Sequence, residues 1–357
     1  MDIIEILRKL TLASGISGYE TEVAAILQAE MPDKINYSRD RMGNLDFHFP
    51  GTEDTPVIQF IAHLDEIGFI VSDITEEGFL RLQPIGGWDP HILPATPLRV
   101  INSESREYYG VIVSVPIHYQ NREAGNQQPG TDDFSLDVGA DSHSRVVNDF
   151  GISLGDPVVP CTNFHYQPES GRVFSKALDD RVGIAALLAI AEILPEMNHP
   201  SHVVLTGSVQ EEVGARGALS LSRRSKADIC IVLEGAPADD VPGIRHHAQT
   251  ALGKGVHIRL YDPHMLVKRE LSDFLIKLAA EKGIPYQPAV RKRGGTDGMH
   301  IHTANIGIPT IVLGVPVRYT HTPHSQMCLS DFQHLIEFLA VIIQKLDTAT
   351  LAGILRT

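Results

Sequence analysis

The spacing of hydrophobic and polar positions changes twice along the chain and divides it into three stretches. In residues 1–65, helical and strand-like patterns follow one another. An amphipathic helix is predicted at the N-terminus and a second over about Thr21–Met31. An apolar strand follows over residues 56–69, "PVIQFIAHLDEIGF". This alternation is typical of an α/β domain.

The middle stretch, about residues 69–165, has almost no helical period. It contains short apolar runs separated by Gly, Pro, Asn and Asp, which predict strands joined by turns. The expected strands cover residues 69–74, 78–86, 98–102 and 108–117. Strands spaced in this way indicate a small all-β barrel or sandwich. The polar, Gly- and Pro-rich run 121–133 is predicted to be a loop within it.

The α/β pattern returns at about residue 166 and continues to the end of the chain. The expected elements are helices over 180–197, 264–283 and 329–347, and strands over 202–209, 227–235 and 309–316. Apolar strands that alternate with helices indicate a mostly parallel sheet with helices on both faces. We therefore predict one α/β domain, residues 1–68 plus 166–357, interrupted by a small barrel-like β-domain, residues 69–165.

Composition and charge restrict the class of protein. The chain has 357 residues, of which 43% are hydrophobic and 21% charged, values that suit a globular protein with a large core. Its formal net charge of -14 argues against nucleic acid or an anionic membrane as the main partner. The three cysteines lie far apart and form no disulfide framework, which favours a reducing compartment. The sequence shows no signal peptide and no membrane-spanning run, so we expect a cytoplasmic protein.

Side chains that bind metals gather where the predicted strands end. Open α/β sheets bind ligands at the carboxyl ends of their strands. The residues at these ends, and in the loop before the helix at about residue 180, are His63, Asp65, Asp179, Asp180, Glu211, Glu212, Glu234 and His321. Imidazole and carboxylate together favour zinc, cobalt or manganese, whereas calcium and magnesium prefer oxygen ligands. The sequence therefore predicts a metal site at this edge of the sheet.

The adjacent residues Glu211 and Glu212 indicate how such a site works. Two divalent cations about 3.5–4 Å apart share a bridging carboxylate and a bridging water, which becomes a hydroxide nucleophile. One glutamate then serves as a ligand, while the other takes the proton from that water. Asp65 lies two residues after His63 on the same strand face, where it can orient the imidazole. Taken singly, the glutamates also suit a solvated turn and the two aspartates a helix cap, but their coincidence favours a two-metal hydrolytic site.

Five ordered motifs carry a resemblance to a known family. They are "AHLDEIGF", "KALDDRVG", "QEEVGARGA", "GGTDG" and "RYTHTP", and the similarity covers nearly the whole chain. The chain resembles the glutamyl and deblocking aminopeptidases, which include the tetrahedral aminopeptidases and members once described as cellulases. The resemblance implies a di-zinc exopeptidase-like fold and a metal-dependent aminopeptidase that acts on short peptides. It also implies two divalent metal ions per subunit, with zinc favoured and cobalt or manganese as alternatives.

The resemblance assigns roles that chemistry alone left open, including the choice between Asp179 and Asp180. It implies His63 as a ligand of one metal, Asp179 as the bridge, Glu212 and His321 as ligands of the second metal, Glu234 as the fifth ligand, Glu211 as the general base and Asp65 as the partner of His63. Many family members carry aspartate in place of Glu234, and the longer side chain leaves the substrate class open. The alternatives are a two-metal deacylase or carboxypeptidase-type amidase acting on N-acyl amino acids, and a non-catalytic metal- or peptide-binding scaffold.

The resemblance also implies an assembly. The β insertion, residues 69–165, begins just after a metal ligand and is expected to serve as a dimerisation domain that shapes access to the site. We expect a homodimer or a higher homo-oligomer, with a dodecamer as in several relatives. The alternative is a monomer in which the insertion acts only as a lid.

Other polar residues near the motifs have weaker claims to a role. His246, His247, His300, His302 and His324 are expected to be structural or to line the pocket. Arg245 and Lys254 follow the fifth ligand, where a basic group could meet a peptide carbonyl or an acidic side chain. The resemblance places Thr296 and Asp297 beside the site. The sequence contains no P-loop and no dinucleotide fingerprint, so nucleotide binding has no support.

Overall fold

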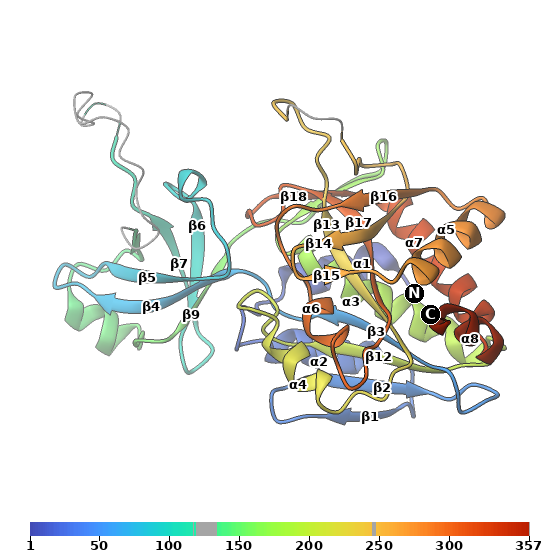
Figure 1. Cartoon of the computed structure of the whole chain (residues 1–357). Helices are drawn as coiled ribbons and strands as arrows, with labels where there is room; N and C mark the ends of the chain where they lie inside the picture. Colours follow the sequence, from blue (N-terminus) through green and yellow to red (C-terminus); the bar gives the residue numbers. More distant parts are fainter. Residues whose placement is uncertain (117, 119–133, 245–247, 357) are drawn as a thin grey trace.

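Four parallel strands form the centre of the larger sheet (Figure 1). The structure is a computed structural model and describes residues 1–116, 118, 134–244 and 248–356. The four strands lie in the order β12 (His202–Ser208), β3 (Val57–His63), β13 (Ile229–Pro237) and β17 (Thr310–Arg318). All three pairings between them are parallel. Nearly every residue of these strands is buried, so both faces of the sheet are covered.

Mostly antiparallel strands extend this centre to a twelve-stranded sheet within the described residues. On one side lie β2 (Leu45–Phe49) and β1 (Asn36–Arg39). On the other lie β18 (Ser325–Cys328), β11 (Arg172–Ser175) and β10 (His165–Gln167). A branch from β17 consists of β14 (Val256–Asp262), β15 (Met265–Leu266) and β16 (Tyr286–Val290). The expectation of a mostly parallel α/β sheet is confirmed in its central strands.

Helices cover this sheet because packing their apolar sides on its apolar faces removes both from water. The helices are α1 (Ile3–Leu12), α2 (Thr21–Glu30), α3 (Leu178–Ile193), α4 (Arg216–Ser222), α5 (Arg269–Lys282), α6 (Gly298–Ile301), α7 (Leu329–Lys345) and α8 (Thr348–Leu355). The most deeply buried helix, α3, packs against β3 and β13, while α7 packs against β14 and β17. In the described part of the chain no single helix is long and apolar enough to cross a membrane, although the bent pair α7 and α8 passes that test together.

The inserted segment forms a closed six-stranded antiparallel barrel, which stands apart from the larger body in Figure 1. Its strands are β4 (Gly68–Ile74), β5 (Leu80–Ile85), β8 (Ser135–Asp137), β7 (Glu107–Ile112), β6 (Pro97–Ile101) and β9 (Pro157–Pro160), in the order around the barrel. The barrel has a hydrophobic core of its own, separate from that of the sheet. The expected barrel-like insertion is therefore confirmed. The predicted loop 121–133 lies outside the described residues.

Two predicted helices have different boundaries in the structure. The helix expected from residue 264 begins only at Arg269, because β14 turns back into the short strand β15. The Asp262 carboxylate stabilises this turn by accepting the amide N–H of His264 at 2.9 Å. The helix expected to reach residue 197 ends at Ile193, since Pro195 cannot continue an α-helix and a 3₁₀ turn follows.

Candidate metal centre and active site

The carboxyl ends of the central strands meet at one edge of the sheet. His63 is the last residue of β3, and Glu234 lies near the end of β13. Glu211 and Glu212 lie in the loop that follows β12, and His321 lies three residues after β17. This edge is where an open α/β sheet binds ligands.

Asp179 at the start of α3 lies between the two histidines. Its Oδ1 is 3.2 Å from Nε2 of His63, and its Oδ2 is 3.7 Å from Nε2 of His321. Each oxygen thus faces a different imidazole. A carboxylate in this position is suited to bridge two cations.

Glu234 and Glu212 each lie beside one of the two histidines. We call the groups around His63 and around His321 the first and the second half-site. Glu234 Oε2 lies 4.0 Å from Nε2 of His63, and Glu212 Oε2 lies 3.3 Å from Nε2 of His321. Oε1 of Glu234 is buried and has no hydrogen-bond partner within the described residues. An unpaired buried carboxylate oxygen is costly unless a cation or donor binds it. The donor set of two imidazoles and three carboxylates fits two divalent transition-metal ions.

A glycine allows Glu234 and Asp179 to approach each other. A Cβ atom at Gly235 would lie 2.7 Å from the carbonyl oxygen of Leu178 and 2.8 Å from Cα of Asp179. Any larger residue would therefore separate β13 from the start of α3. Close packing of these two backbones brings the ligands of the first half-site together.

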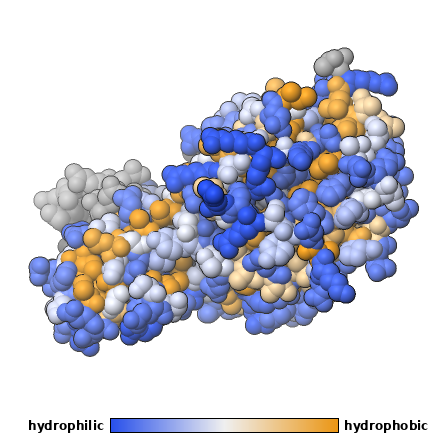
Figure 2. Space-filling view, turned by 90° about the horizontal axis from the view of Figure 1, so that it is seen from below, coloured by the Kyte–Doolittle hydropathy of each residue, from blue (hydrophilic) through white to orange (hydrophobic). Residues whose placement is uncertain are grey.

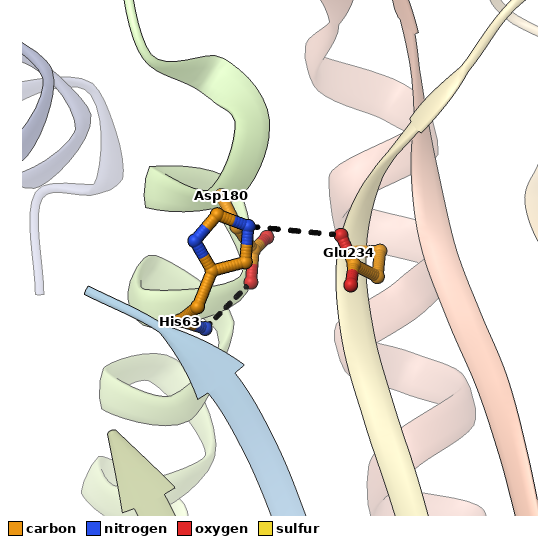
Figure 3. Close-up of side chains that lie close together, drawn as sticks. All are labelled: His63, Asp180 and Glu234. Atoms are coloured by element: carbon orange, nitrogen blue, oxygen red, sulfur yellow. Dashed lines mark hydrogen bonds and ion pairs between the residues drawn. The ribbon is translucent and has the colours of Figure 1, made fainter. Parts of the chain in front are cut away.

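Asp180, which the resemblance set aside, also lies at the centre (Figure 3). Its carboxylate accepts the backbone N–H of His63 at 3.1 Å and that of Gly183 at 3.0 Å. It thus joins the end of β3 to the first turn of α3. The ligand atoms of His63, Asp180 and Glu234 also lie within 4.8 Å of one another. Both Asp180 oxygens therefore already accept amide protons.

Asp65 links His63 to the paired glutamates. Its carboxylate accepts the backbone N–H groups of Glu211 at 2.9 Å and Glu212 at 3.1 Å, and its Oδ2 also accepts the hydroxyl of Ser17 at 2.6 Å. Nδ1 of His63 lies 3.1 Å from the main-chain oxygen of Asp65 and 3.5 Å from its Oδ1. The carbonyl thus fixes the ring and leaves Nε2 directed at the centre. Sequence reasoning missed Ser17, since nothing local marks a serine that is 48 residues from its partner.

The inserted barrel contributes the corresponding contact for His321. Nδ1 of this ring lies 2.9 Å from the carbonyl oxygen of Gly87, in the loop that follows β5. When Nδ1 donates to this oxygen, Nε2 is left as the metal-binding nitrogen. The second half-site is therefore built jointly by the α/β sheet and the barrel.

Burial and mutual repulsion oppose ionisation of the carboxylates in this cluster. Burial raises the pKa of Glu212 to about 7, more than the nearby His321 lowers it. Burial and then the charges of Asp180 and Asp179 raise the pKa of Glu234 well above its usual value, although His63 and Arg259 oppose this. The cluster needs additional positive charge to hold these groups ionised at neutral pH, and divalent ions supply it.

A cavity of about 1090 Å³ opens from these groups towards solvent. Glu211 lines it beside the metal-ligand candidates, and its pKa is raised well above the usual range, first by burial and also by the charges of Glu234 and Glu212. Arg259 of β14 and the segment 290–295 also line the cavity. The cavity gives a ligand access to the metal centre.

The remaining sequence candidates lie around the centre. In the described residues, none of His300, His302 and His324 belongs to a metal-ligating group. Asp297 is buried below the end of β12 and accepts the hydroxyl of Ser208. Lys254 lies exposed in the turn before β14. Residues 245–247, which include Arg245, His246 and His247, are outside the described residues.

Two imidazoles with a carboxylate between them, beside an open cavity, form a donor set of the kind that co-catalytic metallohydrolases use. A match to a family model shows to which family of metallohydrolases the chain belongs. The chain belongs to the M42 glutamyl aminopeptidase family, whose model matches residues 43–338. It is thus a metallo-aminopeptidase, a hydrolase of peptide bonds with a co-catalytic metal site.

Relatives similar over nearly the whole chain carry consistent names. The putative aminopeptidase FrvX of Escherichia coli is 33% identical over 94% of this chain and 93% of its own. The glutamyl aminopeptidase of Lactococcus lactis is 30% identical over 99% of both chains. The lysyl aminopeptidase of Pyrococcus furiosus is 30% identical over 96% of this chain and 97% of its own.

Solved structures agree with this assignment. The TET aminopeptidase of Thaumarchaeota archaeon SCGC AB-539-E09 superimposes with a TM-score of 0.93 at 34% identity, covering 99% of this chain and 98% of that chain. The TET1 peptidase of Pyrococcus horikoshii, which can assemble into a tetrahedron or a large octahedral shell, gives 0.85 at 29% identity and covers 97% and 100%. A further solved structure, PhTET1-12s, has a dodecamer in its asymmetric unit and gives a TM-score of 0.85 at 29% identity.

Proposed function

We propose that the chain releases N-terminal residues from short peptides at a pair of divalent metal ions. The observation that carries this proposal is the position of Asp179, whose two carboxylate oxygens face His63 and His321 separately. His63, Asp179 and Glu234 would hold one ion, and Asp179, Glu212 and His321 the other. Zinc suits this set of nitrogen and oxygen ligands best, with cobalt and manganese as alternatives.

The metal pair, when bound, polarises the scissile carbonyl and lowers the pKa of an attacking water. Glu211 is the residue that we propose for the proton transfer. It lines the cavity without facing either histidine at ligand distance, and Asp65 holds its backbone amide at 2.9 Å. Burial raises the pKa of this carboxyl group well above its usual value, so its carboxylate has a high affinity for a proton. In the ionised form, Glu211 would accept a proton from the attacking water and then donate it to the leaving amine.

Replacing Glu211 tests this role. Glu211→Gln keeps the size of the side chain but cannot accept a proton, so we expect turnover to fall by about 10²–10⁴-fold. Metal content, measured by elemental analysis, should stay close to that of the wild type. The control is Glu281→Gln, which changes an exposed glutamate of α5 and should leave turnover unchanged. Near-normal activity of Glu211→Gln would refute the assignment.

Substrate class is tested by offering amino-acyl amides and N-acyl amino acids side by side, with added zinc, cobalt or manganese. Hydrolysis of the amino-acyl amides supports the proposal. The longer ligand Glu234 is the feature that would favour a deacylase, so cleavage of the acylated substrates alone would replace the proposal with that function. If neither class of substrate is hydrolysed, the remaining alternative is a non-catalytic metal- or peptide-binding scaffold.

We further propose that the chain works as a homo-oligomer in the cytoplasm. Hydrophobic side chains such as Tyr109, Val113 and Leu154 are exposed on the barrel, and Figure 2 shows apolar surface there. A covering subunit would remove this surface from water. All three cysteines are free thiols, which suits a reducing compartment. Assembly into a closed shell would restrict substrates to short peptides.

A further inference from the structure

The cavity beside the metal centre has a basic wall. Four cationic side chains line it, Arg259, Arg291, Lys292 and Arg293, together with the single carboxylate of Asp239 outside the metal cluster. The similar relatives are named for opposite preferences, one glutamyl and one lysyl. Family membership therefore leaves open which substrate charge this wall accepts.

Arg259 occupies the inner part of this wall, on the same face of the sheet as Glu234. In the registers of β14, β17 and β13, Arg259 lies opposite Val312, which lies opposite Val232. Glu234 is two residues beyond Val232, and side chains two apart point to the same face. Two strand spacings separate β14 from β13, roughly 10 Å. Gly314, which lies opposite Glu234 on the strand between them, places no side chain in this space.

The Arg259 guanidinium is buried but incompletely paired. The residue is only 4% exposed, and its Nε has no hydrogen-bond partner within the described residues. Its Nη1 makes one long contact, 3.3 Å, with Oδ2 of Asp262, while the other Asp262 oxygen accepts the amide of His264. A guanidinium presents five N–H donors, so this group retains donors for a ligand.

Arg291, by contrast, is already engaged. Its Nη1 is 3.3 Å from Asp239, and its Nη2 donates to the carbonyl of Pro237 at 2.8 Å and to the hydroxyl of Thr250. In Arg291 only Nε lacks a hydrogen-bond partner among the described residues. In Arg259, Nε lacks one too, and the single ion pair of the guanidinium among these residues is the 3.3 Å contact with Asp262, so Arg259 keeps more donors for a ligand.

We propose that Arg259 is a specificity-determining residue that binds a carboxylate of the peptide substrate. This rests on the aminopeptidase function proposed above. A planar guanidinium with free donors binds a carboxylate through paired, charge-assisted hydrogen bonds, and burial strengthens them. The carboxylate belongs either to the side chain of an acidic N-terminal residue or to the C-terminus of a very short peptide. A lysine side chain would be repelled.

Three substrates distinguish these sources. Glutamyl-p-nitroanilide carries only a side-chain carboxylate, the dipeptide Leu-Gly only a C-terminal one, and leucyl-p-nitroanilide neither. In Arg259→Gln we expect kcat/KM to fall at least about tenfold for a carboxylate-bearing substrate. The value for leucyl-p-nitroanilide should change less than about threefold. A loss on the glutamyl substrate identifies the side-chain source, and a loss on Leu-Gly identifies the C-terminal source. Equal effects on all three substrates would overturn the proposal.

Two further variants separate recognition from folding. Arg259→Gln leaves the buried Asp262 carboxylate without its cation, which by itself could destabilise the fold. The double variant Arg259→Gln/Asp262→Asn removes both charges of the pair and should show the same change in selectivity. Arg259→Lys keeps the charge and should recover part of the preference for the carboxylate-bearing substrate. The matched control is Arg269→Gln, at an exposed position of α5 away from the cavity, which should leave all three substrates unaffected. Melting temperatures identify variants that fail to fold.

A binding measurement keeps this inference separate from the proposed catalysis. Calorimetric titration with 4-aminobutanoate, 5-aminopentanoate and 3-methylbutylamine needs no turnover, because none of them has a peptide bond. The first two carry a carboxylate, as a glutamyl side chain and the C-terminus of a dipeptide do, and the third carries none. The wild type should bind a carboxylate-bearing ligand more tightly than 3-methylbutylamine, and Arg259→Gln should lose that difference. If the wild type hydrolyses no substrate but shows this difference, the proposed function fails and the role of Arg259 stands. If it hydrolyses leucyl-p-nitroanilide but neither measurement depends on Arg259, only the inference fails.

Discussion

At the scale of single residues, the bridging position of Asp179 makes its removal different from the removal of either histidine. We expect Asp179→Ala to lose both metal ions, because the carboxylate faces both half-sites. His63→Ala should lose one ion and His321→Ala the other. Elemental analysis of the dialysed proteins measures this directly. Two ions per subunit in Asp179→Ala would refute the bridge.

A second residue-scale prediction concerns the pH dependence of stability and a histidine that is not among the metal-ligand candidates. His257 on β14 is completely buried, and burial, with Arg259 and Arg291 nearby, holds its pKa well below the usual 6.5. The folded protein keeps this imidazole neutral, while the unfolded chain binds a proton as the pH falls below 6.5. His257 therefore contributes stability above pH 6.5 that is lost at lower pH.

Replacing His257 with Gln should remove this part of the acid sensitivity. Between about pH 7.5 and about pH 5.5, the wild type should lose about 1.4 kcal/mol more free energy of unfolding than His257→Gln. Urea unfolding at both pH values measures the difference. His165→Gln, at an exposed position of β10, is the control and should follow the wild type. Parallel pH profiles of wild type and His257→Gln would contradict the prediction.

At the scale of elements, β13 and the start of α3 can approach this closely only because residue 235 is a glycine. In Gly235→Ala the new Cβ would meet backbone atoms of Leu178 and Asp179, so the two elements must separate. We expect the free energy of unfolding to fall by about 1–3 kcal/mol. Metal affinity should fall because Asp179 moves away from Glu234. Gly353→Ala in α8 meets nothing within 4 Å and should be neutral or slightly stabilising. Equal behaviour of the two variants would show that the contact does not position the ligands.

The strands and their ends could be predicted from the sequence, whereas the contacts between distant segments could not. Apolar runs such as residues 202–209 mark buried strands, and an α/β sheet brings their carboxyl ends together, so the ligand candidates appear without a structure. The carbonyl of Gly87 on His321 and the hydroxyl of Ser17 on Asp65 depend on tertiary packing. The start of α5 was misplaced because the apolar pattern does not distinguish the hairpin strand β15 from a first helical turn. Arg259 was missed because an arginine within an apolar strand carries no local signal.

At the scale of the whole molecule, the exposed apolar surface of the barrel predicts association. A subunit packed on Tyr109, Val113 and Leu154 would bury side chains that a monomer leaves in water. Light scattering at micromolar concentration should therefore give at least twice the 39.1 kDa of one chain. Charged substitutions at two of these positions should lower the mass. If the wild type has the mass of one chain, the prediction is refuted.

The division of the chain into an α/β domain and an inserted β-domain that fold as separate units also stays a prediction.

The hydrogen bond between Gly87 and His321 has a consequence for protein engineering. An excised α/β sheet would retain every ligand in its sequence, yet nothing in it would choose the tautomer of His321 or fix the plane of its ring. A minimal enzyme made by removing the barrel is therefore expected to keep the first metal and to bind the second weakly. By the same reasoning, barrels exchanged between relatives should transfer activity only when the donor places a carbonyl at this position. The α/β sheet and the barrel are therefore expected to act as one catalytic unit.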